Sequence, residues 1–500
     1  MLRKTIGLLA ILLVSQVGVA AANSDNSFSL RQLLEAASRS NPSLKTAYFD
    51  KDAATGSSTA AAGADDFVLG SSLSYNGQKS PLIPGRNPIQ QTVGETISGT
   101  VSVSRSLPTG GQVGVSVSGR TSVQQFQNLL DNNVVLDPAQ TSTSEISANF
   151  SHPLLRGAGS SVARANRKSA ELQLSVAELE VRRQAIATIQ EVSDAYWGLV
   201  LAKEIVKVRE SAVKDAEKEL KASVAAIRAG TIPSSSKRVV EHRIAVRQQE
   251  VVSAKLDVAE RSLALRILVG LEVGPDDVYI ETADRLSMKD RRFRTEETIQ
   301  LALKQNPGLA QARLGVESAQ IQTRVAKDGQ LPQLDASVNG SLLGISNNLG
   351  DSASQLGKGN NYQISAQLSF QYEILNRAGK GSAQAAKARS EIARIGLRQT
   401  ERTLKSQVIM GIYRVRGAYQ NIRVGRTAVE LAEKNLSSER TKFRAGRSST
   451  FQVLERQAEL RDARISLAQS ISSHRQAVST VDTLTGEILV RSGIRFVDIE

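Results

Sequence analysis

The chain has 500 residues, a formal net charge of +14 and aromatic side chains at only 4% of its positions. So few aromatic residues argue against a large globular core and favour long helices that pack through small side chains. The absence of cysteine excludes disulfides, thiolate metal sites, catalytic thiols and a lipid anchor on an N-terminal cysteine. The Lys and Arg residues are spread along helical faces without interleaved aromatic residues, which argues against nucleic acid as a partner.

Residues 1–22 predict a secretory signal peptide. Arg3 and Lys4 precede an apolar run at 6–19, and the alanines at 20–22 fit a small-residue cleavage site. The alternative, a membrane anchor, is disfavoured because the run is short for a spanning helix. No later apolar run approaches about 20 residues, so any membrane crossing must use strands.

A helix that breaks and restarts at an Asn-Pro pair is predicted twice. Residues 30–40 are apolar at helical spacing and end at Asn41-Pro42, and the same pattern recurs at 299–305 before Asn306-Pro307. Asn is a good N-cap and Pro suits the first helical position, so each pair starts a new helix after a joint.

Two blocks predict β-strands, at about 66–152 and about 333–372. In both, apolar residues alternate with Ser, Thr, Asn or Gln, most cleanly at 362–372. Such alternation over about ten residues suits a membrane β-barrel, although a half-buried strand of a soluble antiparallel sheet alternates too. Polar segments suited to long outer loops, together with the signal peptide, favour the barrel; these segments are 76–92, 124–144 and 345–361.

The strands of one chain are too few to close a barrel, because about eight strands is the practical minimum. Unpaired strand edges are not tolerated in lipid. We therefore expect the chain to associate with copies of itself.

Each strand block is followed by a predicted helical hairpin, at about 161–269 and about 381–485. The long descending helices keep a seven-residue apolar rhythm and would each span roughly 100 Å, while the returning helices are about half as long. The mixed polar segment 271–294 is suited to a collar around the helices.

The second half of the chain repeats the first. Residues 211–220 read SAVKDAEKEL and residues 427–436 read TAVELAEKNL, with six of ten positions identical. Each stretch leads to an Arg-Ala-Gly turn and, at the same spacing, to a further glycine, Gly270 or Gly486. Such matches at one offset indicate an internal duplication. We predict repeats at 23–274 and 275–500.

These features together resemble the TolC-type outer-membrane efflux proteins. The residues that carry the resemblance are the two Asn-Pro joints, the strand exit HPLLRGAG at 152–159, and the glycine pairs Gly230/Gly270 and Gly446/Gly486. The resemblance implies an α+β membrane protein in which three protomers form a 12-stranded outer-membrane β-barrel, continued by a 12-helix coiled-coil barrel in the periplasm. It also implies a periplasmic adaptor and an inner-membrane pump as partners.

One feature departs from that family. The first repeat has about 45 more residues than the second between its Asn-Pro pair and its strand exit, and the turn at 108–111 could form an additional hairpin. The strand count per trimer is therefore 12 or 18. We expect 12, or about four strands per protomer, to match the 12 helices.

The resemblance also implies where the pore narrows. In similar proteins, carboxylates just past the second-repeat turn form rings in the pore, and the matching residues here are Gln452 and Glu455, with Arg456 and Arg447 placed to pair with Glu455. The first-repeat tip has Ser236 where relatives often carry Asp. We therefore expect a pore end that is less cation-selective than in acidic relatives.

The two tip turns are predicted to dock the adaptor. Glycine is needed there because the chain must leave the helix in a left-handed conformation. The residues of these turns are Arg228, Ala229, Gly230 and Thr231 in the first repeat and Arg444, Ala445, Gly446 and Arg447 in the second.

No catalytic or metal-binding constellation is visible, and no cofactor is expected. The three histidines lie on separate elements without a partnered carboxylate or nucleophile. We predict a passive exit duct for efflux or type I secretion in the outer membrane, extending into the periplasm. The alternative is a soluble periplasmic coiled-coil adaptor. The cargo and the pump are left open.

Overall fold

The computed structural model describes residues 27–79, 90–128, 139–230, 232–275, 277–288 and 291–494. The predicted signal peptide and Thr231 lie outside these ranges. The described chain divides into two compact units, one built from residues 46–184 and 299–407 and the other from residues up to 45, 185–298 and 408 onward. Both predicted repeats contribute to each unit.

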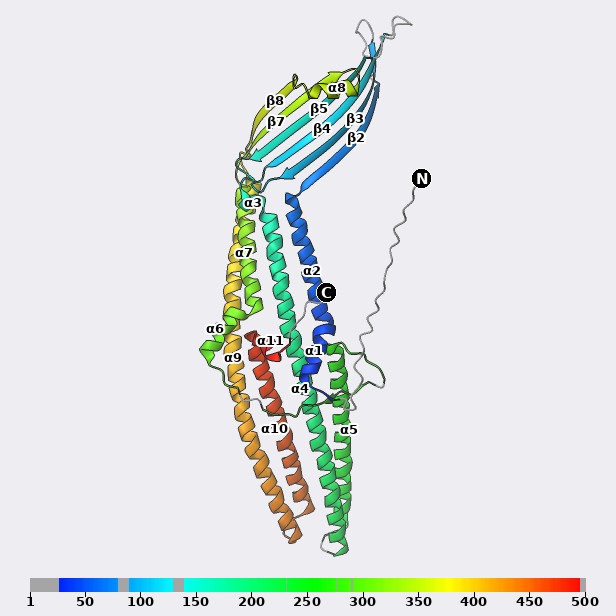
Figure 1. The fold of residues 1–500 in the computed structure, drawn as a ribbon. Helices are drawn as coiled ribbons and strands as arrows, with labels where there is room; N and C mark the ends of the chain where they lie inside the picture. The colour runs from blue at the N-terminus through cyan, green and yellow to red at the C-terminus, as the bar shows by residue number, and fades with distance from the viewer. Residues whose placement is uncertain are drawn as a thin grey trace, which may run out of the picture. The chain divides into compact units, whose positions relative to one another are not determined.

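A single antiparallel sheet dominates the first unit (Figure 1). Its order is β2-β3-β4-β5-β7-β8, so each strand lies beside its neighbour in the chain. The strands are β2 (Phe67–Lys79), β3 (Gln90–Ser106), β4 (Gln112–Asn128), β5 (Ala139–Pro153), β7 (Gln333–Ser346) and β8 (Tyr362–Gln371).

The expectation of about four strands per protomer is wrong, because the described residues form six in this sheet. The additional pair is the hairpin of β3 and β4, which turns at 107–111 through Gly110 with φ of 100°. Leu107 both donates its amide to the Gly111 carbonyl and accepts from the Gly110 amide. The extra residues of the first repeat alternate over their full length, so they pair on both sides and extend the sheet.

Two of the expected outer loops are shorter than predicted. The segments 76–92 and 124–144 are polar, yet β2 continues to Lys79, β3 begins at Gln90, β4 continues to Asn128 and β5 begins at Ala139. Cross-strand hydroxyl pairs such as Thr121–Ser142, at 3.0 Å, join the sheet here, so polar composition alone did not indicate a loop.

The third expected loop, 345–361, contains a short helix, α8 (Leu349–Leu356), that lies against the sheet. Ser352 of α8 is fully buried, and its hydroxyl is 2.7 Å from that of Ser144 on β5. Gln355 hydrogen-bonds both the amide and the carbonyl of Ile345. Gly344 leaves room for this contact, since a Cβ there would lie 1.8 Å from the Ser352 carbonyl oxygen.

Four helices continue from the sheet within the same unit. They are α2 (Pro42–Ala62), α7 (Pro307–Asp328) and the parts of α4 (Ala165–Arg228) and α9 (Arg377–Arg444) next to the sheet. The short α3 (Ser160–Ala163) and the 3-10 turn η1 (Gly63–Asp65) lie at the junction. Ala165 and Leu172 of α4 pack on Ile321 of α7. Thr323 of α7 donates its hydroxyl to the Ala386 carbonyl of α9 at 3.1 Å.

The second unit holds two helical hairpins and a collar. One hairpin is the lower part of α4 with α5 (Ser235–Val269), and the other is the lower part of α9 with α10 (Thr450–Leu484). Its main core joins α4, α5 and α1 (Leu30–Ser40) through Leu33, Tyr196, Leu199 and Leu265. The remaining elements are β1 (Ser27–Phe28), β6 (Glu281–Thr282) and α11 (Glu487–Ser492), while α6 (Thr295–Gln305) begins in this unit and continues into the first.

Both Asn-Pro joints are confirmed. The Asn41 side chain accepts the Leu44 amide at 3.0 Å, and the Asn306 side chain accepts the Leu309 amide at 3.0 Å. Each asparagine therefore caps the helix whose first residue is the following proline.

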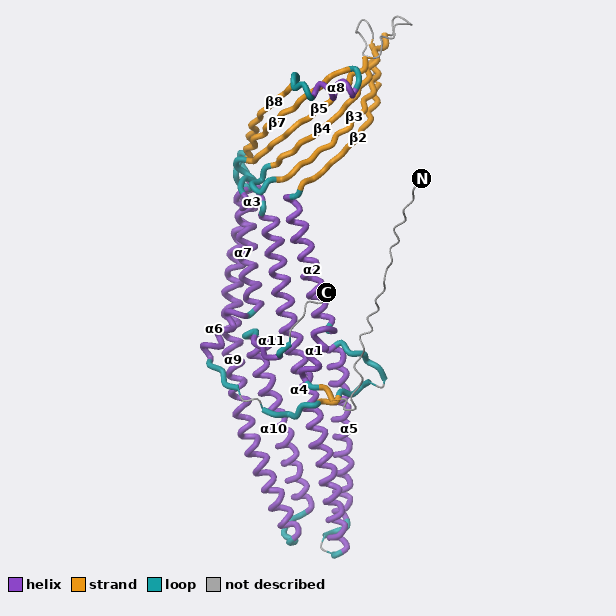
Figure 2. Tube along the Cα trace, in the orientation of Figure 1, coloured by secondary structure: helices purple, strands orange, loops and turns teal. Residues whose placement is uncertain are grey.

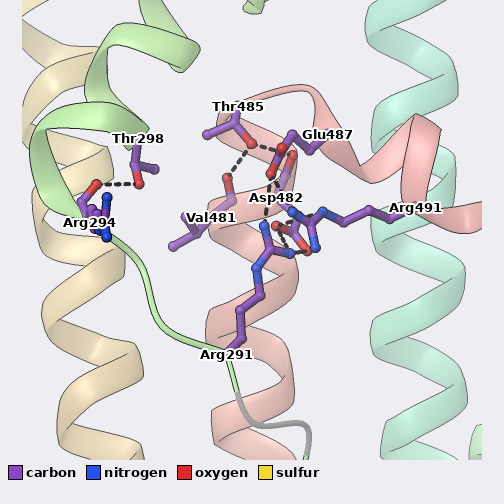
Figure 3. A network of polar contacts seen from close by, with 8 residues as sticks. All are labelled: Arg291, Arg294, Thr298, Val481, Asp482, Thr485, Glu487 and Arg491. Carbon is purple, nitrogen blue, oxygen red and sulfur yellow. Dashed lines mark hydrogen bonds and ion pairs between the residues drawn. The ribbon is translucent and has the colours of Figure 1, made fainter.

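In the described residues of the collar, which are 271–275, 277–288 and 291–294, the chain is loop apart from β6, which pairs with β1 (Figure 2). A partly buried arginine anchors the collar: Arg291 contacts Asp482 of α10 and Glu487 of α11, the latter at 2.8 Å (Figure 3). Arg491 also binds Glu487, at 2.9 Å. The mixed polarity of the segment therefore serves ion pairing with the helix ends.

Candidate channel wall and hairpin tips

One face of the sheet is almost entirely polar. Because directly paired residues share a face, the registers place Ser, Thr, Asn and Gln of all six strands together, with Arg120, Glu145 and Asp335 among them. Ser74–Ser98 and Ser116–Ser147 form cross-strand hydroxyl contacts of 2.7 Å. A surface of this kind offers a hydrated passage with few fixed charges.

The opposite face is apolar and exposed. Leu73 is 82% exposed and Ile364 is 72% exposed, although both are large hydrophobic residues. Aromatic residues stand near both ends of the outermost strands, with Phe67 and Tyr75 on β2 and Tyr362 and Phe370 on β8. An outward apolar band with aromatic residues at its two borders is the pattern of a membrane-spanning barrel wall.

The second-repeat tip closes α9 with a hydrogen-bond pattern that requires glycine. The Gly446 amide donates to the Phe443 carbonyl and the Arg447 amide to the Lys442 carbonyl, while Gly446 has φ of 69°. This is a Schellman motif, in which the residue after the helix adopts the left-handed conformation. Ala445 and Arg444, also predicted for this turn, are exposed beside it.

The first-repeat tip also ends α4 at a left-handed glycine. Gly230 has φ of 72° and donates its amide to the Ile227 carbonyl, and the exposed Arg228 and Ala229 precede it. The left-handed glycines predicted at both turns are confirmed. Thr231, the fourth residue predicted there, lies outside the described residues.

The predicted aperture residues lie at the start of α10 and α5. Ser449 caps α10 by accepting the Gln452 amide at 3.3 Å, and the Ser448 hydroxyl is 2.9 Å from the Gln452 side-chain oxygen. Glu455 is exposed one turn further on. Ser236 lies in the first turn of α5, and its amide donates to the Pro233 carbonyl.

The expected pairing of Arg456 with Glu455 is wrong within the protomer. The Arg456 guanidinium binds both oxygens of Glu459 at 2.7 Å instead. Neighbouring helical positions point in different directions, whereas residues three apart share a face, so the local partner is Glu459. No hydrogen bond joins Ser236 to Gln452, Glu455 or Arg456 in the part of the chain that the structure describes.

A cavity of about 520 Å³ lies between α4 and α9 close to the tips, and sequence reasoning missed it. Asp215 and Glu219 of α4 and Arg440 of α9 line it, with Arg440 3.9 Å from Asp215. Burial raises the pKa of Glu219, and the nearby Arg440 opposes that shift. A signal was available: at these positions the duplicated stretch has Leu431 and Asn435 in place of the two carboxylates.

A buried arginine also links the two hairpins. Arg247 of α5 is 1% exposed and donates to the Ala212 carbonyl of α4 at 2.8 Å and to the Gln457 side chain of α10 at 3.2 Å. Burial and the nearby Arg461 and Arg243 lower its pKa. Arg461 of α10 in turn binds Glu250 of α5 at 3.4 Å. Nothing in the apolar pattern distinguished Arg247 from the solvated cations around it.

The histidines are not brought together. His152 Nε2 is 2.9 Å from the Thr109 hydroxyl, His474 is buried near Tyr419, and His242 is exposed. Across the described ranges, no group of three His, Asp or Glu side chains could hold a metal ion. Among the same residues, no helix is long and apolar enough to cross a membrane.

The fold defined by this sheet and these hairpins is that of the TolC-type outer-membrane channels. The crystal structure of the CmeC outer membrane channel of Campylobacter jejuni has a TM-score of 0.67 at 14% identity, covering 92% of this chain and 86% of that one. VceC of Vibrio cholerae gives 0.66 at 16% identity, covering 91% and 96%. The open state of the MtrE channel of Neisseria gonorrhoeae gives 0.63 at 13% identity, covering 91% and 88%.

A family model agrees with the fold. Residues 298–487, most of the second predicted repeat, match the family described as outer membrane efflux protein. No curated protein is similar enough to this chain to count as a match. Over residues 298–487 the chain matches the outer membrane efflux protein family, and over most of its length it has the fold of the TolC-type outer-membrane channels.

Proposed function

We propose that this chain assembles as a homotrimer that forms the passive exit duct of a tripartite efflux or type I secretion system. A periplasmic adaptor would dock on its hairpin tips, and an inner-membrane pump would supply the energy. The observation that carries the proposal is the sheet, which is polar on one face, apolar and exposed on the other, and open at both edges. Such a sheet is incomplete in a membrane until β2 and β8 find partners.

The helices support the same assembly. α9 has a second apolar stripe, opposite its buried face, that is exposed in the protomer and keeps a seven-residue spacing at Met410, Val424 and Leu431, with Tyr413 beside it. A heptad seam on an exposed helix face is material for a further coiled-coil contact. In a trimer, this seam would meet the next protomer while β8 pairs with that protomer's β2.

Three copies of a six-stranded sheet would close into an 18-stranded barrel. Barrel diameter grows roughly linearly with strand number, so this barrel would be about one and a half times as wide as one of 12 strands. Barrels of 16 to 18 strands leave an aqueous channel. The additional hairpin of β3 and β4 would therefore widen the membrane section without adding helices below it.

The experiment that tests the duct is a measurement on the purified full-length product. We expect a detergent-solubilised trimer that resists SDS without heating, and stepwise conductance after insertion into planar lipid bilayers. A monodisperse monomer that produces no conductance in lipid would contradict the proposal.

At the tip, three copies of Glu455 would leave a single carboxylate ring, because the neighbouring ring position is the neutral Gln452. Repeated carboxylates in a confined space raise the local field and favour cations. We therefore expect weak cation selectivity, largely lost in Glu455→Gln, from single-channel reversal potentials in asymmetric KCl. Strong cation selectivity that Glu455→Gln leaves unchanged would argue against this aperture.

The tip turns are the proposed docking surface for the adaptor. Gly446 needs its left-handed φ, and a β-branched residue is strongly disfavoured there. Gly446→Val should distort the turn and reduce export, measured at equal trimer levels in cells. Gly396→Val, in the middle of α9 with open space around its Cβ position, is the matched control. Wild-type export by Gly446→Val would remove this assignment.

A further inference from the structure

The positive charge of the chain is concentrated on one helix. α9 has sixteen Lys and Arg residues against five Glu residues and no Asp, a net charge of +11 out of +14 for the whole chain. In the upper part of α9 the cations form a stripe, because their spacings of seven, four and three residues keep them on one face. The stripe comprises Lys380, Lys387, Arg394, Arg398, Arg402 and Lys405.

The stripe is exposed and poorly neutralised. All six side chains belong to exposed residues, and the ion pair found among them is Arg394 with Glu391 at 2.9 Å. The upper part of α4 contrasts with this, since Arg167 and Lys168 both lie within 3.6 Å of Glu171. A solvated helix surface usually mixes its charges as α4 does, so the uncompensated stripe requires another explanation.

The hydrogen bonds of β7 show on which side of this strand β5 and β8 lie when the sheet is viewed from its apolar face. Leu343 donates its amide to Asn361, just before β8, whereas Leu334 on the apolar face accepts the Leu154 amide after β5. Apolar-face residues of β7 thus direct their backbone groups toward β5. When a strand of L-residues runs upward and a side chain points at the viewer, the N–H and C=O of that residue point to the viewer's right. Seen from the apolar face, β5 is right of β7 and β8 is left, the order seen in Figure 1.

The stripe lies on the side of α9 that corresponds to the apolar face of the sheet. α7 leads into β7 and α9 continues from β8, so α9 lies left of α7 when both are viewed from the apolar side. The buried residues of α9, Ala383, Ala386 and Ser390, point toward α7. Residues of a right-handed helix advance clockwise by about 100° each when viewed from the N-terminus. The stripe lies about 80° clockwise of the buried residues, and therefore on the same side as the apolar face of the sheet. In the proposed trimer the stripe would therefore face away from the lumen.

The length of the stripe constrains its partner. From residue 380 to residue 405, α9 rises about 38 Å. A lipid headgroup layer is only about 5–8 Å thick, so it could reach no more than the first turns of α9 next to the sheet. The cations instead match an extended polyanion in the periplasm. Peptidoglycan is such a polymer, because its stem peptides carry free carboxylates throughout the net.

We propose that the basic stripe of α9 binds the carboxylates of peptidoglycan and so fastens the duct to the cell wall. This inference rests on the proposed function, because it needs the trimeric duct with the apolar sheet face toward lipid. Exposed charge pairs are weak singly and are screened by salt, but six cations on each of three protomers would act together.

The test is retention of the purified full-length trimer by isolated sacculi at physiological salt. In the stripe variant, Lys387, Arg394, Arg398 and Lys405 are all replaced by Gln. The matched control replaces four cations off the stripe by Gln: Lys168, Arg182, Arg389 and Arg414. We expect retention to fall about tenfold in the stripe variant and less than twofold in the control. Amidation of the sacculus carboxylates, which removes their charge, should lower retention of the wild-type trimer as much as the stripe substitutions do.

Conductance in planar bilayers is measured on the same samples, so that a failure of the duct is distinguishable from a failure of the stripe. The inference stands if the stripe variant conducts normally and is not retained. It is overturned if a conducting wild-type trimer is not retained, if both variants lose retention equally, or if the stripe variant changes ion selectivity while retention is unchanged. The last result would place the stripe in the lumen.

Discussion

Arg291 shows how much one side chain contributes when it is buried between charges. Its side chain is 12% exposed and contacts Asp482, itself 11% exposed, and Glu487. Removing Arg291 leaves the two poorly solvated carboxylates to share one remaining cation, Arg491, at a cost of about 3 kcal/mol. Arg291→Ala should therefore lower the free energy of unfolding by about that amount, measured by urea titration with circular dichroism.

Arg294 provides the matched control for this prediction, three residues along the chain (Figure 3). Its side chain is 83% exposed and pairs only with the exposed Glu297. Arg294→Ala should produce no measurable change in the urea midpoint, because water replaces the lost partner. Equal midpoints for the two variants would show that the collar network does not hold the helix ends.

The carboxyl group of Asp194 should make the stability of the fold depend on pH. Burial raises its pKa from 3.8 to about 6, partly offset by a hydrogen bond from Gln190. The folded chain therefore keeps a proton that the unfolded chain has released, so this contribution to stability is complete below about pH 4 and is lost as the pH rises through 6. Asp194→Asn should raise the thermal midpoint at pH 7.5 and leave it unchanged at pH 4.

The exposed Asp50 of α2 supplies the control, since Asp50→Asn should follow the wild-type midpoint at both pH values. The assignment to Asp194 is contradicted if the thermal midpoint changes between pH 4 and pH 7.5 by the same amount in Asp194→Asn, in Asp50→Asn and in the wild type.

At the scale of an element, α8 is held against the sheet by contacts that small residues allow. A Cβ on Gly344 would lie 1.8 Å from the Ser352 carbonyl oxygen, whereas a Cβ on Gly340, in the same strand and on the same face, meets nothing within 4 Å. The chain has no cysteine, so Ser144→Cys with Ser352→Cys introduces a single possible disulfide. We expect this pair to cross-link, Gly344→Ala to prevent the cross-link and Gly340→Ala to preserve it.

Non-reducing electrophoresis after a cut between the two cysteines would measure this cross-link. Equal cross-linking in the two glycine variants would show that α8 is not seated on the sheet. The prediction tests the element independently of the assembly, because both cysteines belong to one protomer.

Also at this scale, the sequence predicted those elements that depend on local chemistry. The Asn-Pro caps, the left-handed tip glycines and the period-two strands each follow from one or two residues and their spacing. The strand count could not be predicted from such local signals. Whether the turn at 107–111 belongs to a hairpin within the sheet depends on the pairing of β3 with β2 and of β4 with β5. Arg247 and the cavity beside Glu219 depend on contacts between distant helices, which spacing along one helix does not specify.

At the scale of the whole molecule, the additional hairpin allows the width of the barrel to be changed without changing the helices. Removing residues 90–128 deletes β3 and β4 and leaves β2 beside β5, and the registers place Ser71 and Ile146 on the same face as before. The variant therefore keeps the polar and apolar faces intact. It should form trimers with 12 strands on an unchanged set of helices, and a membrane section about two-thirds as wide.

Exclusion of neutral polymers added from the outer side of a bilayer would measure the width of that section. The largest polymer that lowers conductance should be smaller for the deletion variant than for the wild type, while ion selectivity, which belongs to the tip, stays the same. An identical cut-off for both trimers would mean that β3 and β4 do not lie in the barrel wall. A deletion variant that fails to trimerise would mean instead that the hairpin closes the wall, and a count of strands by cryo-electron microscopy of the wild type would then decide between 12 and 18.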